Sequence, residues 1–408
     1  MGYMKLKKML IICVISLFTQ YSFSQVLDST RLDILLKSNV LSNQNLLQDA
    51  ATVLGDAISN SPSDSVLFVK RAEIYFQMQH FQATIQDLEK INIENNSELC
   101  LLMCKSYLKI KNLDAAKVYL EKSMKCTERI SLRKLKTDLD IATLVADIQF
   151  DKWVNQYYSK DDKLVSSAQQ NYNHGNIEET LNTIEDLKKI DSQKFNSFVL
   201  LAEIKSSTGE FKDAVKFYDK ALKINEIYAI RLKKYEVEML LKNYQKAYDD
   251  INKLIESKPE NIELYLFATK LANTLKNNTL AQKHLNFYLK YNKNSNQGNF
   301  YKSKILFENQ DNITSLEIVN QLIEDDISNS EYYLLRGRIY REIEMFDFAY
   351  RDLSMSLDLN PKCTEAYLLR GELRYEKGDV DGAKHDWLKA KEQGSYKALN
   401  LLHTNLLD

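Results

Sequence analysis

The chain contains few of the residues that interrupt regular secondary structure. Its 408 residues include only 3 prolines and 10 glycines, while 44% of the residues are hydrophobic. Proline disrupts helix interiors, and disordered or loop-rich chains are enriched in both proline and glycine. The scarcity of both residues therefore indicates an all-α protein.

A bias toward charge of one sign is also absent. Lysine and arginine total 55 residues against 56 aspartates and glutamates, and the sequence has no long run of one sign. Binding to a nucleic-acid backbone or to an anionic membrane depends on concentrated positive charge. We therefore expect no nucleic-acid partner and a surface of mixed charge.

The apolar run near the N-terminus, residues 9–18, is shorter than the roughly 20 residues that span a bilayer as a helix. Three lysines precede it within 5–8, and small residues occupy both ends of 22–24. This pattern predicts a signal peptide over 1–24, and cleavage would leave Gln25 first. The alternative is an anchoring helix. We expect an exported protein, periplasmic or extracellular, without a stable membrane span after cleavage.

Catalytic and metal-binding motifs are missing. The five histidines are scattered without metal-ligand spacing, and the sequence has neither a phosphate-binding glycine loop nor a Gly-x-Ser-x-Gly motif. Cys100 and Cys104 lie four residues apart, which is poor geometry for a disulfide on a helix, so we expect buried thiols rather than a disulfide or a zinc site. We predict no catalytic residue, no cofactor and no metal. If the protein were an enzyme, its catalytic residues would have to be brought together from distant repeats.

What the sequence does contain is a repeat. Leu-Leu-Arg-Gly occurs at 334–337 and again, thirty-four residues later, at 368–371. Other positions recur at the same interval: Tyr333 and Tyr367, Ala349 and Ala383, Leu353 and Trp387. A fixed period of this length indicates stacked repeats that bury their apolar faces against their neighbours.

The second copy has the pattern of a helical hairpin. A first helix is expected from Glu365 to about Lys377, and Gly378 is suited to end it because glycine adopts the left-handed conformation easily. A second helix then carries Ala383 and Trp387 on one stripe. Small residues in both helices, such as Gly371 and Ala383, allow the helices to approach closely.

This pattern resembles the tetratricopeptide repeat, a helix-turn-helix of thirty-four residues. The first copy supplies the residues of the family signature in order: Tyr333, Gly337, Tyr340, Ala349, Leu353, Ser356 and Pro361. The second copy departs at Arg374 and at Ser395, which replaces the proline. The resemblance implies a right-handed superhelical solenoid of about ten TPR-like repeats, whose first helices line a concave groove that binds partners.

Turn residues recur through the C-terminal half at intervals of thirty-four: Gly175, Gly209, Asn243, Asn277, Asp311 and, after a break at Met345, Asp379. Each tolerates left-handed or turn geometry. We therefore divide the chain into TPR-like repeats over 25–125, a TPR array over 161–394, and a capping helix and tail over 395–408. The intervening residues 126–160 lose the register, and their middle lacks glycine, asparagine and proline. They form either a degenerate repeat or a continuous connecting helix.

Two sets of residues are candidates for binding. By resemblance, the groove is lined by Gln169, Tyr172, Glu236, Met239, Arg338, Arg341, Glu372 and Tyr375. The alternative for these residues is a plain solvated helix face. Independently, four aromatic residues share one helical face, Phe150, Trp153, Tyr157 and Tyr158. They either pack between the arrays or form an exposed platform for a peptide or sugar.

The resulting hypothesis is a non-enzymatic, exported scaffold that holds segments of other proteins, expected to be envelope proteins, in the groove. The alternative is a glycan- or peptidoglycan-binding module that uses exposed aromatic residues. The sequence pattern does not distinguish monomer from oligomer.

Overall fold

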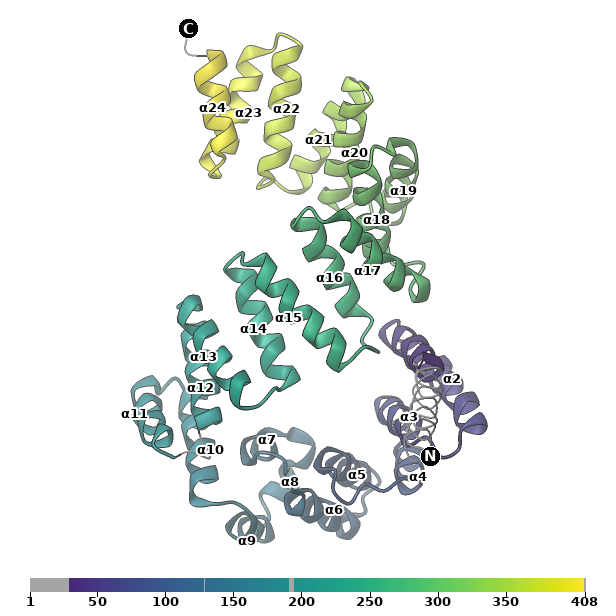
Figure 1. Ribbon diagram of the computed structural model, residues 1–408, viewed down its shortest axis with the longest axis vertical. Helices are drawn as coiled ribbons and strands as arrows, with labels where there is room; N and C mark the ends of the chain where they lie inside the picture. The colour runs from purple at the N-terminus through teal and green to yellow at the C-terminus, as the bar shows by residue number, and fades with distance from the viewer. Residues whose placement is uncertain (1–28, 128, 191–193, 407–408) are drawn as a thin grey trace, which may run out of the picture. The chain divides into compact units, whose positions relative to one another are not determined.

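The computed structural model describes residues 29–127, 129–190 and 194–406 (Figure 1), and throughout these residues all regular secondary structure is helical. The chain divides into two compact units, residues 1–264 and 265–408, and each is described by itself. The predicted signal peptide lies outside the described residues. Among the described helices, none combines the length and apolar character that a membrane span requires.

The first unit begins with a helix over residues 29–43. It continues with α2 (Leu47–Asn60), α3 (Ser65–Gln77), α4 (Phe81–Glu89), α5 (Ser97–Lys109), α6 (Leu113–Lys125), α7 (Leu132–Thr137), η1 (Leu139–Ile141), α8 (Ala142–Val145), α9 (Ile148–Tyr157), α10 (Lys160–Asn173), α11 (Ile177–Lys188), α12 (Lys194–Ser207), α13 (Phe211–Ile224), α14 (Tyr228–Leu240) and α15 (Tyr244–Ser257). The helix α16 (Glu263–Thr274) spans the boundary between the units.

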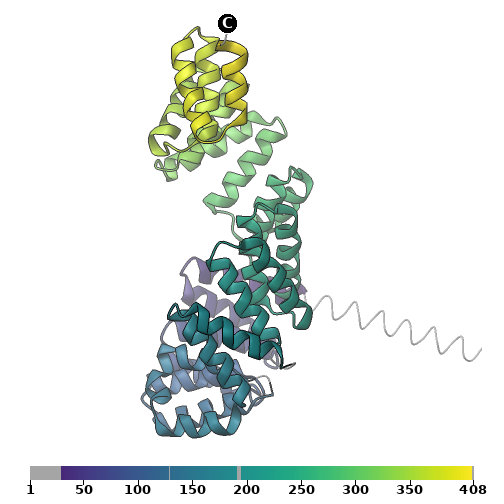
Figure 2. The same ribbon diagram turned by 90° about the vertical axis from the view of Figure 1, so that its left-hand side faces the viewer.

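The second unit continues with α17 (Asn278–Tyr291), α18 (Asn296–Glu308), α19 (Asn312–Asp325), α20 (Ser330–Glu342), α21 (Phe346–Leu359), α22 (Thr364–Glu376), α23 (Val380–Glu392) and α24 (Tyr396–Leu406). With α7 to α9 set aside, the described helices before α24 form ten consecutive helix-turn-helix pairs. The prediction of an all-α fold built from about ten stacked hairpins is confirmed. At the C-terminal end, α22, α23 and α24 run side by side (Figure 1 and Figure 2).

The interhelix turns share one backbone geometry, but the expected turn residues occupy two different positions in it. Gly175 and Gly209 are themselves left-handed, with φ of +81° and +80°. In the later hairpins the left-handed residue is the one directly before the expected turn residue, for example Lys276, with φ +56°, before Asn277. Asn277 and Asp311 instead precede the second helix, and their side chains accept hydrogen bonds from the backbone N–H groups three residues on, at 3.1 and 3.2 Å.

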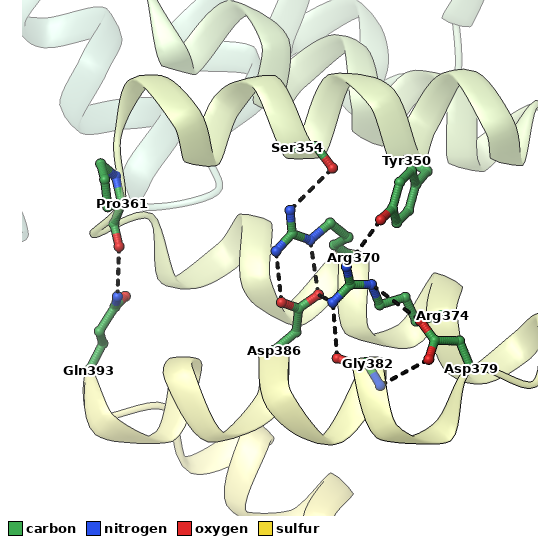
Figure 3. Close-up of polar contacts among 9 residues, drawn as sticks. All are labelled: Tyr350, Ser354, Pro361, Arg370, Arg374, Asp379, Gly382, Asp386 and Gln393. Atoms are coloured by element: carbon green, nitrogen blue, oxygen red, sulfur yellow. Dashed lines mark hydrogen bonds and ion pairs between the residues drawn. The ribbon is translucent and has the colours of Figure 1, made fainter.

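Buried ion pairs recur within the hairpins, and the sequence interpretation above did not anticipate them. In three hairpins an arginine of the first helix contacts both carboxylate oxygens of an aspartate sixteen residues later in the second helix. The pairs are Arg71 with Asp87, Arg336 with Asp352 and Arg370 with Asp386, at N to O distances of 2.6 to 2.9 Å. Figure 3 shows the last pair, in which Arg374 also donates to Asp386 at 3.1 Å. These pairs fix the register between the two helices.

The segment between α6 and α10 is a series of short helices, so the alternative of one continuous connecting helix is wrong. Aspartate and serine side chains make the breaks that glycine, asparagine or proline would otherwise make. Ser131, Asp138 and Asp147 each accept a backbone N–H at the start of α7, η1 and α9 respectively. A side chain that competes for backbone N–H groups ends one helix and starts the next.

Candidate partner-binding groove

The predicted groove residues lie on the first helices of their hairpins and fall into two sets, one in each unit. Arg338 and Arg341 are on α20, and Glu372 and Tyr375 are on α22. The other set, Gln169, Tyr172, Glu236 and Met239, is on α10 and α14. The two sets belong to different units, so each is a separate candidate surface.

Two residues of the set in the second unit, Arg338 and Arg341, line an open hollow of about 480 Å³, here named the C-terminal hollow. Arg338 and Arg341 line it from α20, Phe307 from α18 and Leu369 from α22. The remaining lining residues are Glu342, Glu344, Phe346 and Glu376. Three successive first helices therefore contribute to one surface, as stacking of the repeats requires.

The two arginines are held by carboxylates yet remain partly exposed. Nε of Arg338 lies 3.5 Å from Oε1 of Glu365, and its guanidinium carbon lies 4.9 Å from the centre of the Phe307 ring. Nη1 of Arg341 lies 2.6 Å from Oε2 of Glu372, and its Nη2 lies 3.7 Å from Glu376. The side chains of both arginines are about 30% exposed. Each guanidinium is thus positioned without being closed off from a ligand.

Two other predicted residues of this unit act differently. Glu372 is nearly buried and accepts from Lys397 at 2.6 Å as well as from Arg341, so it positions the arginine rather than lining the hollow. Tyr375 is exposed, and its ring packs 5.6 Å from that of Trp387. Of the four predicted residues in this unit, Arg338 and Arg341 are therefore the two that line the C-terminal hollow.

The set in the first unit contributes to a second hollow of about 420 Å³, here named the N-terminal hollow. Tyr172 lines it from α10, Glu203 from α12, and Lys233, Glu236 and Leu240 from α14. The Tyr172 hydroxyl donates to the Glu203 carbonyl at 3.2 Å. Lys233 also forms an ion pair with the Glu203 carboxylate.

Burial determines which groups of this surface can be charged. Tyr218 also lines the N-terminal hollow, and burial, with the nearby Glu203 and Glu236 carboxylates, raises its pKa, so its hydroxyl stays neutral. Glu236 is exposed, whereas Met239 is half-buried and lies outside the lining. The N-terminal hollow therefore combines an exposed carboxylate, a lysine and aromatic hydroxyl groups.

Gln169 lies apart from Tyr172 despite sharing α10. Only 2% of Gln169 is exposed, and its amide donates to Asn173 Oδ1 at 3.1 Å. It lines a third hollow of about 400 Å³ beside the short helices, with Lys136, Val145, Phe150, Asp151, Ser166, Gln170, Asn173 and His174. The expectation that one groove surface contains both Gln169 and Tyr172 is wrong, because the α10 stripe faces two different neighbours.

The aromatic face around Trp153 is packed inside the first unit. Phe150, Trp153 and Tyr158 are buried in a cluster with residues of α5 and α6, and the Tyr158 hydroxyl donates to the Ile130 carbonyl at 2.6 Å. Tyr157, partly buried, donates to Glu121 at 2.7 Å. The face is therefore packed, and the exposed platform is wrong; the buried cluster joins it to α5 and α6 of the N-terminal repeats, whereas packing between the two arrays was expected. The glycan-binding alternative loses the aromatic surface on which it mainly depended.

Phe307 was missing from the predicted groove, although the repeat spacing contains the signal for it. It precedes Arg341 by one period of thirty-four residues, so it occupies the same repeat position. Glu344 and Phe346 were also missing, because Glu344 belongs to the turn between α20 and α21 and Phe346 is the first residue of α21, so both lie outside the first-helix positions considered. In the described residues, no three histidine, cysteine, aspartate or glutamate side chains gather in a way that could hold a metal ion.

Comparison with known proteins supports the repeat assignment. Residues 195–228 match the sequence model of the tetratricopeptide repeat. A TPR repeat-containing protein of Methanocaldococcus jannaschii is 24% identical over 208 residues, which are 50% of this chain and 34% of that relative. The match thus spans about a third of the relative's length.

Solved structures with the same architecture include a tetratricopeptide repeat protein from Parabacteroides merdae. It is 19% identical, and the likeness has a TM-score of 0.51 over 60% of this chain and 97% of that protein. YrrB, described as a TPR protein with an unusual peptide-binding site, is 20% identical, with a TM-score of 0.36 over 48% of this chain and 97% of YrrB. The likeness to the Parabacteroides protein shows that the fold is that of a TPR solenoid.

Proposed function

We propose that the chain is a non-enzymatic scaffold that binds a segment of a partner protein along the first helices of its hairpins. The observation that carries this proposal is the C-terminal hollow. There Arg338 and Arg341 lie between an aromatic side chain of the preceding hairpin, Phe307, and an aliphatic side chain of the next, Leu369. A polypeptide with acidic and apolar side chains matches both parts of this lining.

The ion pairs of the C-terminal hollow favour exchange with a ligand. Partly exposed ion pairs contribute only about 0–1 kcal/mol each. A ligand carboxylate can therefore replace Glu365 beside Arg338, or Glu376 beside Arg341, at little cost. Apolar ligand surface buried against Phe307 adds roughly 25 cal/mol per Å² to binding. The preferred partner segment is thus acidic and apolar rather than basic.

Charge reversal in the C-terminal hollow is expected to weaken partner binding. The Arg338→Glu/Arg341→Glu variant places two carboxylates beside existing ones and repels an acidic segment. We expect the immobilised variant to retain the partner at least roughly tenfold less well than the unmodified chain, a loss of about 1.4 kcal/mol or more in binding free energy. Quantitative mass spectrometry of proteins captured from envelope extract measures this loss.

The matched control is Lys384→Glu/Lys391→Glu. Both lysines are exposed on α23, a second helix, and the net charge changes by the same amount. We expect this variant to capture the partner as the unmodified chain does. Equal capture by the unmodified chain and the groove variant would place the binding surface elsewhere, and substrate turnover by the purified protein would contradict a scaffold.

We also propose that the chain is exported, because the lysines at 5–8, the apolar run 9–18 and the small residues at 22–24 have the arrangement of a signal peptide. Expression of the full sequence in a bacterium is expected to yield a protein that begins at Gln25 in the envelope fraction. Intact-mass measurement identifies the first residue. The Ile11→Asp/Ile12→Asp variant, with its apolar run broken, is expected to stay uncleaved in the cytoplasm. An uncleaved cytoplasmic unmodified chain would rule out the proposed signal peptide.

A further inference from the structure

Two cysteines far apart in sequence lie at one end of the α5–α6 hairpin. Cys100 is in the first turn of α5, and Cys126 is the residue directly after α6. Because the two helices of a hairpin run antiparallel, the start of the first helix and the end of the second are at the same end. The hairpin fold therefore brings these two residues together.

The two sulfur atoms contact consecutive residues of one loop. Sγ of Cys100 lies 3.3 Å from the carbonyl oxygen of Ile93, and Sγ of Cys126 lies 3.5 Å from the carbonyl oxygen of Glu94. The next loop residue, Asn95, accepts from the Thr127 backbone N–H at 3.1 Å. The loop 93–95 thus holds both cysteines, which belong to one buried cluster.

The surroundings of the two cysteines determine how readily their thiols react. Cys100 is fully buried and Cys126 nearly so. Burial, and then the neighbouring Cys126 thiol, raise the pKa of Cys100 to about 12. At neutral pH the folded Cys100 thiol is therefore protonated. Both sulfur atoms are shielded by burial, so the pair reacts slowly with external oxidants or reductants.

We propose that Cys100 and Cys126 form a disulfide when the chain folds in an oxidising compartment. A thiolate of one cysteine attacks a small-molecule or protein disulfide and releases one thiol, which leaves a mixed disulfide. The second cysteine thiolate attacks that mixed disulfide and releases the second thiol. Two cysteine thiols are oxidised and one external disulfide is reduced to two thiols. The bond forms before the cluster closes and is then protected by it.

The bond ties α6 to α5 immediately before the series of short helices. It closes the chain between residues 100 and 126, so it reduces the conformational freedom of the unfolded hairpin. The remaining cysteines are not equivalent to this pair: Cys104 faces a different cluster, with Leu120 and Ile141, and Cys363 lies in the second unit. The fifth cysteine, Cys13, lies in the predicted signal peptide. The proposal therefore assigns one pairing among the four cysteines of the described residues.

Oxidative refolding tests the pairing independently of export and of partner binding. The chain from Gln25 onward, which contains four of the five cysteines, is denatured, reduced and refolded in a mixture of reduced and oxidised glutathione, and free thiols are then alkylated. We expect the intact mass to show two alkylated cysteines instead of four, peptide mapping to link Cys100 to Cys126, and the melting temperature to exceed that of the reduced protein by several degrees.

Two variants separate the pairing from general effects of cysteine loss. The Cys104→Ser/Cys363→Ser variant is expected to form the same link and to keep the melting-temperature difference between oxidised and reduced samples. In Cys126→Ser that difference is expected to vanish while circular dichroism still reports the helical fold. Four alkylated cysteines in the refolded protein, or a link that involves Cys104 or Cys363, would overturn the proposal.

Discussion

Replacing Asp386 by alanine is expected to lower the free energy of unfolding of the last hairpin by about 3–5 kcal/mol, because it leaves buried positive charge without its partner. Asp386 is fully buried and accepts from Nε and Nη2 of Arg370 at 2.9 and 2.8 Å and from Nη1 of Arg374 at 3.1 Å (Figure 3).

The two arginines keep only neutral partners after the substitution, apart from Asp379, which lies 3.6 Å from Nε of Arg374. Arg370 retains the Ser354 hydroxyl at 3.1 Å, and Arg374 retains the Gly382 carbonyl and the Tyr350 hydroxyl at 3.1 and 3.0 Å. Burial acts to lower the pKa of Arg370, and the hydrogen bonds and charge of Asp386 outweigh it. Removing Asp386 leaves the cost of burial uncompensated.

Urea unfolding followed by Trp387 fluorescence in a Trp153→Phe background measures the loss, because Trp387 is then the single tryptophan and lies next to Asp386. The control is Asp347→Ala, which removes a largely exposed carboxylate paired with Lys377, and its urea midpoint is expected to stay nearly unchanged. Adding Arg370→Met to Asp386→Ala is expected to recover stability. Similar midpoints for Asp386→Ala and Asp347→Ala would contradict the buried-pair argument.

The hairpins themselves could be predicted because their determinants repeat at a fixed interval. The expected helices from Glu365 and after Gly378 agree with α22 and α23, and Gly378 has φ of +82°. Small and large residues at fixed repeat positions specify which faces of the two helices in a hairpin pack together. All of these residues lie within one repeat. The stacking of one hairpin on the next follows from the same positions.

The buried ion pairs were not predicted because a charged residue on a helix is normally assigned to solvent. Arg370 and Asp386 are sixteen residues apart on different helices, so their contact appears only after the hairpin register is known. The same spacing in Arg71 with Asp87 and in Arg336 with Asp352 was nevertheless visible in the sequence. A periodic charge pair across the turn is thus a usable signal for this architecture.

The candidate site was harder to predict than the fold, since repeat position does not specify exposure. Arg338 and Arg341 line a hollow, whereas Gln169, which also occupies a predicted groove position, is buried against the irregular segment. Packing against the neighbouring repeats determines which residues at the same repeat position are exposed to solvent. The short helices after α6 have no period from which to infer their neighbours.

Adding one methyl group at Gly371 is expected to destabilise the last hairpin by about 1–3 kcal/mol, since overpacking forces a rigid ring to move. A Cβ at Gly371 would lie 2.6 Å from both Cδ1 and Nε1 of Trp387. The indole is almost fully buried and packs against Tyr375. The gain in helix propensity from glycine to alanine, about 1 kcal/mol, is included in this range.

The preceding hairpin supplies a matched control, because Gly337 occupies the same position thirty-four residues earlier. A Cβ there would meet Cγ and Cδ2 of Leu353 at 3.0 and 3.2 Å. A leucine side chain can shift by a few tenths of an ångström more easily than an indole, so the propensity gain offsets the contact. We expect Gly337→Ala to be nearly neutral. Hydrogen exchange of the backbone amides of the altered hairpin, measured by mass spectrometry, reports the local opening free energy of each variant.

A double-mutant cycle with Trp387→Leu gives the sharpest form of this prediction. The Trp387→Leu substitution alone opens space beside Gly371 and lowers protection of α22 and α23. In that background the alanine methyl group fills space instead of displacing an indole, so Gly371→Ala is expected to change sign and increase protection. A Gly371→Ala effect of the same size and sign in both backgrounds would show that contact with Trp387 is not what requires glycine at this position.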